Sequence, residues 1–160
     1  MRQIKKSLEG HHNLQSFVYT KGIFYIHIIE SSHIADINHY LSNFQGGLLE
    51  TPALANSVRV VHQSYENAHP YFQGYDCSNN PQAGPMLSDT DKTEEQIQDR
   101  SFEIYEMFMG GAQKKMENPS YKVGTMIVLS NDDMSLLVSD HFMSLGEYLR
   151  IYCGEMNVDR

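Results

Sequence analysis

Residues 16–30, SFVYTKGIFYIHIIE, constrain the fold more than any other stretch of the chain. Two runs rich in β-branched and aromatic residues flank a short TKG segment, and its glycine, Gly22, can adopt the positive φ that a tight hairpin loop requires. The stretch therefore predicts a β-hairpin. Its second strand, residues 23–29, is apolar at nearly every position, so we expect it to be buried on at least one face within a sheet.

The segments around the hairpin predict a small α+β domain. Residues 2–9 have a short helical pattern, residues 31–47 an amphipathic helix that ends at two glycines, and residues 58–63, VRVVHQ, a third strand. A short edge strand around Tyr71 is a further expectation. The order helix, strand, strand, helix, strand is that of a ferredoxin-like βαββαβ domain without its first strand, because Met1 stands where the first helix should already be running.

A missing first strand has a physical consequence for such a sheet. That strand is central, so its absence leaves two rows of unpaired backbone groups, and exposed edges of this kind template association. We therefore expect an additional strand to be supplied, either by residues upstream or by another chain through β-augmentation.

The chain changes character after residue 76. Asparagine, proline, glycine, serine and aspartate predominate in residues 78–91, which is typical of a loop. We predict a core domain at 1–76, a linker loop at 77–92 and a mainly helical extension with one strand at 93–160.

The extension should contain three capped helices, with N-caps at Thr93, Ser130 and Ser144. The first has an apolar face and should be weakened or ended by the Gly110-Gly111 pair. Residues 123–129 are apolar and should form the strand of the extension.

Net charge, apolar runs and cysteine content indicate the class of partner and the cellular location. The net charge is −8, which argues against a nucleic-acid partner and favours a protein partner. No apolar run reaches the roughly 18 residues of a membrane span, so no membrane partner is expected. Cys77 and Cys153 are far apart and form no CxxC motif, which favours a reducing, cytoplasmic location.

The residues do not predict an enzyme or a metal site. The eight histidines lack the spacings of zinc sites, and neither cysteine has a recognisable histidine and asparagine frame. Asp133 is best explained as a helix-capping carboxylate. For His27, in the most apolar strand, we prefer a core histidine with a hydrogen-bond partner over a ligand-facing or acid–base histidine.

Aromatic residues offer a candidate interface. Protein interfaces favour such side chains, although the same rings could simply cover a sheet edge. The candidate interface residues are Tyr65, Tyr71, Phe72, Tyr75 and, on the first helix of the extension, Phe108.

The hairpin resembles that of the BLUF (blue-light-using flavin) domain. Tyr19, Gly22 and Phe24 match its Y-x-x-G-x-F pattern, and Ile29-Glu30-Ser31 resembles its Leu-Glu-Gly end if one residue is inserted. The resemblance covers about residues 2–76. Residues 141–159, HFMSLGEYLRIYCGEMNVD, are similar to the C-terminal part of the testis-expressed, BLUF-like proteins of animals, which are associated with sperm and motile cilia and are not known as photoreceptors.

Departures from the family pattern shape the functional expectation. BLUF photochemistry uses a tyrosine on the first strand, an asparagine on the first helix and a glutamine on the third strand. Here the first strand is absent, Asn13 lies in a loop, and the glutamine position falls on Ile26 or His27. The resemblance thus implies no cofactor and a non-catalytic structural or adaptor protein of a larger assembly, such as a motile cilium or sperm axoneme. The alternative is a sensor that binds FAD, FMN or another small ligand through His27 and Tyr19.

Overall fold

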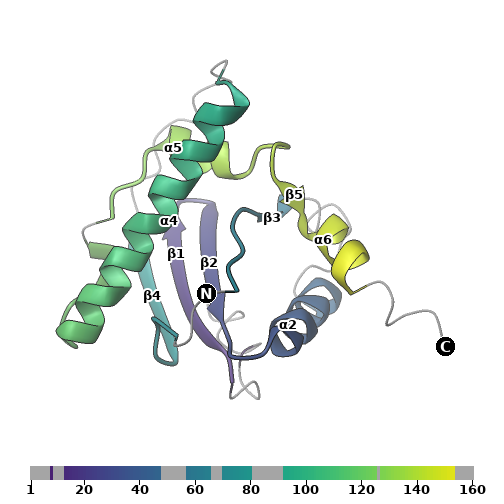
Figure 1. Cartoon of the computed structure of the whole chain (residues 1–160). Coiled ribbons are helices and arrows are strands. Elements are labelled where there is room, and N and C mark those ends of the chain that lie inside the picture. The colour runs from purple at the N-terminus through teal and green to yellow at the C-terminus, as the bar shows by residue number, and fades with distance from the viewer. Residues whose placement is uncertain are drawn as a thin grey trace.

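The computed structural model describes Leu8 and residues 13–47, 57–65, 70–80, 92–125 and 127–153. Within these residues the fold is α+β, with a mixed three-stranded sheet, a two-stranded sheet and four α-helices (Figure 1). The elements in chain order are β1 (Gln15–Lys21), β2 (Phe24–Glu30), α2 (Ile34–Gly47), β3 (Arg59–Val60), β4 (Tyr75–Asn80), α4 (Glu94–Glu117), the 3-10 helix η1 (Val123–Thr125), α5 (Asn131–Leu137), β5 (Met143–Ser144) and α6 (Leu145–Tyr152). No helix among the described residues is both long and apolar enough to cross a membrane.

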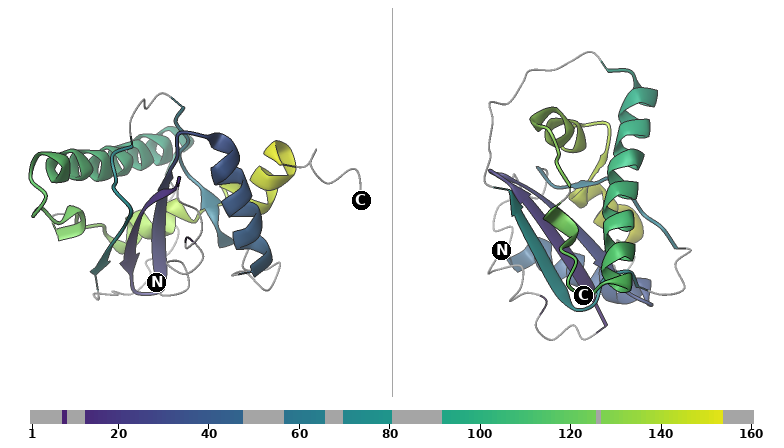
Figure 2. Two further views of the ribbon diagram at one scale, coloured as in Figure 1. Left: turned by 90° about the horizontal axis from the view of Figure 1, so that it is seen from below. Right: turned by 90° about the vertical axis from the view of Figure 1, so that its left-hand side faces the viewer.

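The predicted hairpin is confirmed, and its first strand is the centre of the larger sheet. β1 pairs antiparallel with β2 on one side and parallel with β4 on the other (Figure 2). The register runs from Lys21 opposite Phe24 to Gln15 opposite Glu30, so Gly22 and Ile23 form the loop. Gly22 has φ 58°, the left-handed conformation that favours glycine.

Alternate residues of β1 enter two hydrophobic clusters on opposite faces of the sheet. Phe17 and Tyr19 belong to the first cluster, and Val18 belongs to the second. Helices α4 and α5 cover the first face, whereas α2 and α6 cover the second (Figure 1). The sheet is therefore the middle layer between two helical layers, in contrast to a ferredoxin-like sheet, which carries its helices on one face.

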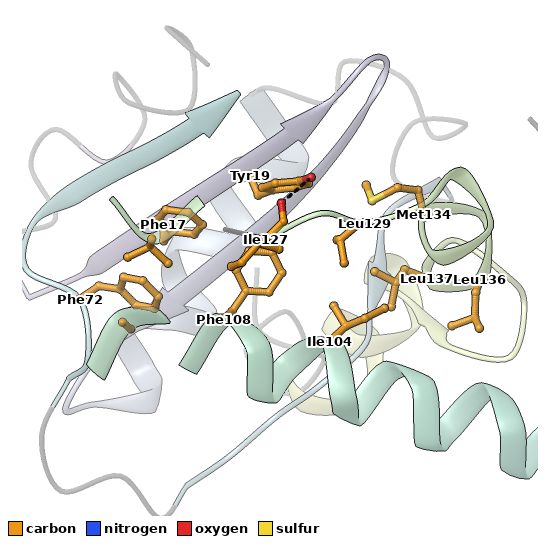
Figure 3. Packing of buried hydrophobic residues seen from close by; sticks show 12 residues of the cluster. Phe17, Tyr19, Phe72, Ile104, Phe108, Ile127, Leu129, Met134, Leu136 and Leu137 are labelled. Carbon is orange, nitrogen blue, oxygen red and sulfur yellow. Dashed lines mark hydrogen bonds between the residues drawn. The ribbon is translucent and has the colours of Figure 1, made fainter. Parts of the chain in front are cut away.

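Aromatic rings anchor α4 to the sheet. Phe108 is 1% exposed and lies 5.8 Å from the ring of Phe17 and 5.6 Å from that of Tyr19, between centroids (Figure 3). All three predicted N-caps are confirmed, and each forms a capping box with the third residue of its helix. Contrary to expectation, α4 continues through Gly110 and Gly111 to Glu117; Gly111 faces Val123 so closely that an added Cβ would lie 3.0 Å from its Cγ1.

The predicted third strand is short and pairs elsewhere. Only Arg59–Val60 is a strand, and it pairs antiparallel with Met143–Ser144 rather than with the hairpin. The strand expected around Tyr71 begins instead at Tyr75 and runs into the predicted loop. Its polar sequence carries no strand pattern, and its pairing with β1 comes from tertiary contact.

The strand expected at residues 123–129 is wrong. Residues 123–125 form η1, and residues 127–130 after it belong to neither a helix nor a strand. Ile127 and Leu129 lie in the first cluster, over the face of the sheet and away from its edges. The carbonyl group of Ile127 accepts a hydrogen bond from the Tyr19 hydroxyl (Figure 3). That of Leu129 accepts one from the Lys21 side chain, so side chains rather than a neighbouring strand satisfy these two carbonyls.

The predicted division at residues 77–92 is not reflected in the packing. Residue 77 lies inside β4, and residues 81–91 are outside the described part of the chain. Side chains from both sides of the boundary share each cluster: Phe17 packs with Phe108, and Val18 with Leu145. The helix expected at residues 2–9 also lies outside the described residues, except that Leu8 is helical and contacts the second cluster.

Truncation of Phe108 tests the anchoring of α4. We expect Phe108→Ala to lower the free energy of unfolding by about 3–5 kcal/mol, because it leaves a cavity between α4 and β1. The matched control is Phe102→Ala on the same helix, whose ring is 51% exposed. It should change stability by no more than about 0.5 kcal/mol in urea denaturation. Equal effects of the two variants would contradict this packing.

The contact between η1 and β4 can be tested with glycine substitutions. An added Cβ on Gly124 would lie 1.9 Å from Ser78 Oγ, so Gly124→Ala should destabilise by about 1–3 kcal/mol. Ser78→Gly in the same chain should recover most of that loss in urea denaturation.

A second glycine substitution tests α4. An alanine Cβ at Gly110 would have no atom within 4 Å, so Gly110→Ala should stabilise α4 by about 0.5–1 kcal/mol in urea denaturation.

Candidate functional site

The outer edge of β2 is the backbone row of Tyr25, His27 and Ile29, which faces away from β1. A two-residue loop places hydrogen bonds at the closing pair, Lys21 and Phe24, and at every second pair from there. The residues between these pairs direct their N–H and C=O groups outward. On the β1 side of the ladder the same alternation lets Ser16 N–H donate to Gly74 C=O at 2.8 Å, towards β4.

This edge has no strand beside it among the described residues. β2 is the end strand of the three-stranded sheet, and Tyr25, His27 and Ile29 form no backbone hydrogen bond with another described segment. Their outward groups comprise one N–H and one C=O each, hence three donors and three acceptors. No group within the described residues satisfies them through the backbone.

Both faces of β2 are apolar, although the strand is only partly buried. Phe24, Ile26 and Ile28 pack against the first cluster, and Ile29 packs against the second. No residue of β2 is fully buried, whereas β1 has four consecutive buried residues, 16–19. β2 is thus less covered than β1, although side chains of both strands contact the two clusters.

The two edges of the sheet differ in how they are protected. Proline, lysine and irregular backbone normally protect an edge strand, and β2 has none of these between Phe24 and Ile29. The opposite edge, β4, has a mostly polar sequence and is held by an ion pair between Asp76 and Lys115. Gly124 of η1 also packs against Ser78 there. Of these two edges, only that of β2 offers an apolar template for a further strand.

Glu30 is the last residue of β2, and a hydrogen bond holds its carboxylate in place. Its Oε2 atom accepts a hydrogen bond from the backbone N–H of Phe72 at 2.8 Å. Burial raises the pKa of the Glu30 carboxyl above its usual value, against the opposing effect of backbone hydrogen bonds. This contact ties the end of β2 to the segment that leads into β4.

His27 is a partly buried histidine with partners. Its Nε2 lies 2.6 Å from Ser16 Oγ, and its ring meets that of Tyr40 edge-on with centroids 5.9 Å apart. Burial lowers the pKa of His27 from its usual 6.5 to about 4. A serine beside a histidine could suggest a nucleophile and base, but Ser16 is only 1% exposed, so no substrate can reach it.

Tyr19 does not share a site with His27. In the register of the hairpin, His27 is opposite Val18, so its side chain lies on the face of the second cluster. Tyr19 lies on the other face, where its hydroxyl donates to Ile127 C=O and accepts from Asn80 Nδ2. The two residues considered for flavin binding are thus separated by the sheet.

Most of the aromatic interface candidates lie in the protein interior. Phe72 and Phe108 are buried in the first cluster, which removes both from the surface. Tyr71 and Tyr75 are partly buried against the two clusters. Tyr65 alone among the five is well exposed, at 69%. The residue types indicated that these aromatic side chains take part in packing. They could not show which of them lie in the core and which on the surface.

The described residues contain no grouping of three or more histidine, cysteine, aspartate or glutamate side chains that could hold a metal ion. Cys77 is exposed and Cys153 is buried in the second cluster. Asp133 caps α5 as predicted and also forms an ion pair with Arg100, with an O–N distance of 2.8 Å. The sequence signal for β2 as a strand was its mostly apolar composition.

The lowered pKa of His27 predicts a pH-dependent stability. Between pH 6.5 and 4 the unfolded chain binds a proton that the folded protein excludes, so stability falls as the pH falls through this window. From pH 7 to pH 5 the loss should be about 2 kcal/mol. His27→Gln should lack this part of the pH dependence in urea denaturation. Parallel pH profiles for the two proteins would contradict the burial of His27.

Comparisons with known proteins provide no family for the chain. No protein-family model and no curated protein matches the sequence. The similarity to BLUF-like proteins therefore stays a prediction, and function has to be argued from the geometry of the described residues.

Proposed function

We propose that the chain is a non-catalytic adaptor that binds an extended segment of a partner protein along the outer edge of β2. The observation that carries this proposal concerns the side of β2 that faces away from β1. There Tyr25, His27 and Ile29 direct backbone groups outward, and no described strand lies beside them. A bound segment would continue the sheet, which is the β-augmentation mode of peptide recognition.

The surroundings of β2 specify the chemistry of the segment. An added strand would lie beside Ile26 and Ile28 on one face and Ile29 on the other, near both clusters. It should therefore be apolar or β-branched on both faces and should have no proline in its middle. Backbone hydrogen bonds would supply affinity, and each contributes about 0.5–1.5 kcal/mol net.

The resemblance to testis-expressed, BLUF-like proteins supports a place for this adaptor in a large assembly, such as a motile cilium or sperm axoneme. A ferredoxin-like sheet has a strand beside the second strand of the hairpin, the position of the open edge of β2, although the present sheet differs from that fold in its strand order and in carrying helices on both faces. The positions of Tyr19 and His27 on opposite faces argue against the flavin-sensor alternative.

A proline scan of β2 tests the docking edge. The N–H of Tyr25 faces outward, so Tyr25→Pro removes an edge donor without removing a bond to β1. Tyr25→Ala is the matched control, because it removes the same 38%-exposed side chain but keeps the donor. Seven-residue peptides selected by display on the wild-type protein should be apolar and should bind Tyr25→Ala. They should bind Tyr25→Pro at least about tenfold more weakly, since loss of a docking strand costs more than one hydrogen bond.

Amide hydrogen exchange then locates the bound peptide. Binding should slow exchange at Tyr25, His27 and Ile29, whereas the amides of Ile26 and Ile28 should be protected already by the pairing with β1. Equal binding by Tyr25→Pro and Tyr25→Ala would refute the proposed edge. If the wild-type protein dimerises through this row and Tyr25→Pro is monomeric, the occupant is a second copy rather than a partner segment.

A further inference from the structure

A hollow of about 420 Å³ lies between α4 and the segments next to β3 and β5. The segment after β3 contributes Val61 and His62, and the segment before β5 contributes His141 and Phe142. From α4 comes Phe102, which is 51% exposed. None of these residues belongs to the outer edge of β2, so the hollow is a separate surface.

Aromatic rings lie together at this hollow, with Phe102 of α4 and His62 in its lining and Tyr105 next to them. The ring of His62 stacks on that of Tyr105 with centroids 3.8 Å apart, and Phe102 lies 6.0 Å from Tyr105 and 6.3 Å from His62. Burial lowers the pKa of His62, which keeps its ring neutral at pH 7. Neutral aromatic faces exposed in this way attract cations.

Two acidic side chains flank Phe102 on the surface of α4, beside the hollow rather than in its lining. Asp99 and Glu106 are three and four residues away along the helix, hence neighbours on its surface, and both are exposed. The cation nearest to them in the sequence, Arg100, is engaged with Asp133 and Glu103. Neither Asp99 nor Glu106 has an ion-pair partner within the described part of the chain.

We infer that this hollow receives an arginine side chain of a partner protein, with the guanidinium over the ring of Phe102 and its charge facing Asp99 and Glu106. Arginine fits better than lysine because its planar group stacks on rings and pairs with carboxylates through a fork of donors, and because it is more weakly hydrated. This contact goes beyond the proposed docking edge of β2 and does not depend on it.

The direct test is an NMR titration of the full chain with N-acetyl-arginine amide. We expect saturable shifts of the His62, Phe102 and His141 amide signals, with an affinity in the millimolar range that weakens as salt is added. The citrulline analogue has almost the same shape without the charge, and it should bind at least about fivefold more weakly. Equal shifts with both compounds would overturn the inference.

Substitutions test whether N-acetyl-arginine amide binds at the hollow rather than at any exposed aromatic ring. Phe102→Ala should weaken the binding of N-acetyl-arginine amide about two- to fivefold. Tyr152→Ala on α6 is the matched control, because Tyr152 is also 51% exposed, and it should leave binding unchanged. Glu106→Gln keeps the shape of an exposed side chain and should also weaken binding.

Two results would reject the arginine site. Unchanged binding in both Phe102→Ala and Glu106→Gln would show that the shifts come from another surface. The second result is a lower dissociation constant for spermidine than for N-acetyl-arginine amide, measured from the same amide signals. It would identify a free polyamine as the ligand instead.

Discussion

Pairing of β1 on both of its edges is the constraint on which the described structure depends. β2 and β4 satisfy its backbone groups, while its side chains enter both clusters in alternation. Because Phe17 and Val18 point in opposite directions, helices are needed on both faces. The helices α4 and α6 supply that cover from the C-terminal half of the chain, so both halves contribute to each cluster in the described residues.

The same arrangement leaves the two sheet edges with different properties. β4 is polar, and the contact between Gly124 and Ser78 together with the Asp76–Lys115 ion pair protects it. β2 combines apolar faces with outward backbone groups and has no such protection among the described residues. An edge of this kind favours association with a further strand, which is what the proposed adaptor function requires.

Only part of the candidate site follows from residue types. The apolar run of β2 predicted a strand within a sheet, and the apolar setting of His27 predicted a histidine packed against other residues. The roles of the aromatic residues could not be predicted, because Phe72 and Phe108 are core residues while Phe102, not singled out by its sequence context, is exposed. Burial depends on which helix face meets the sheet, and that is a property of packing rather than of composition.

The sequence by itself determined the features that depend on interactions over a few residues. These are the hairpin with its glycine loop and the capping boxes at Thr93, Ser130 and Ser144. Tertiary structure alone decided that the polar segment Tyr75–Asn80 becomes a strand and that the apolar residues 127–129 do not. The physical reason is the position of each segment: the first lies at an open edge of β1, where backbone groups need partners, and the second crosses a sheet face, where side chains satisfy its carbonyls.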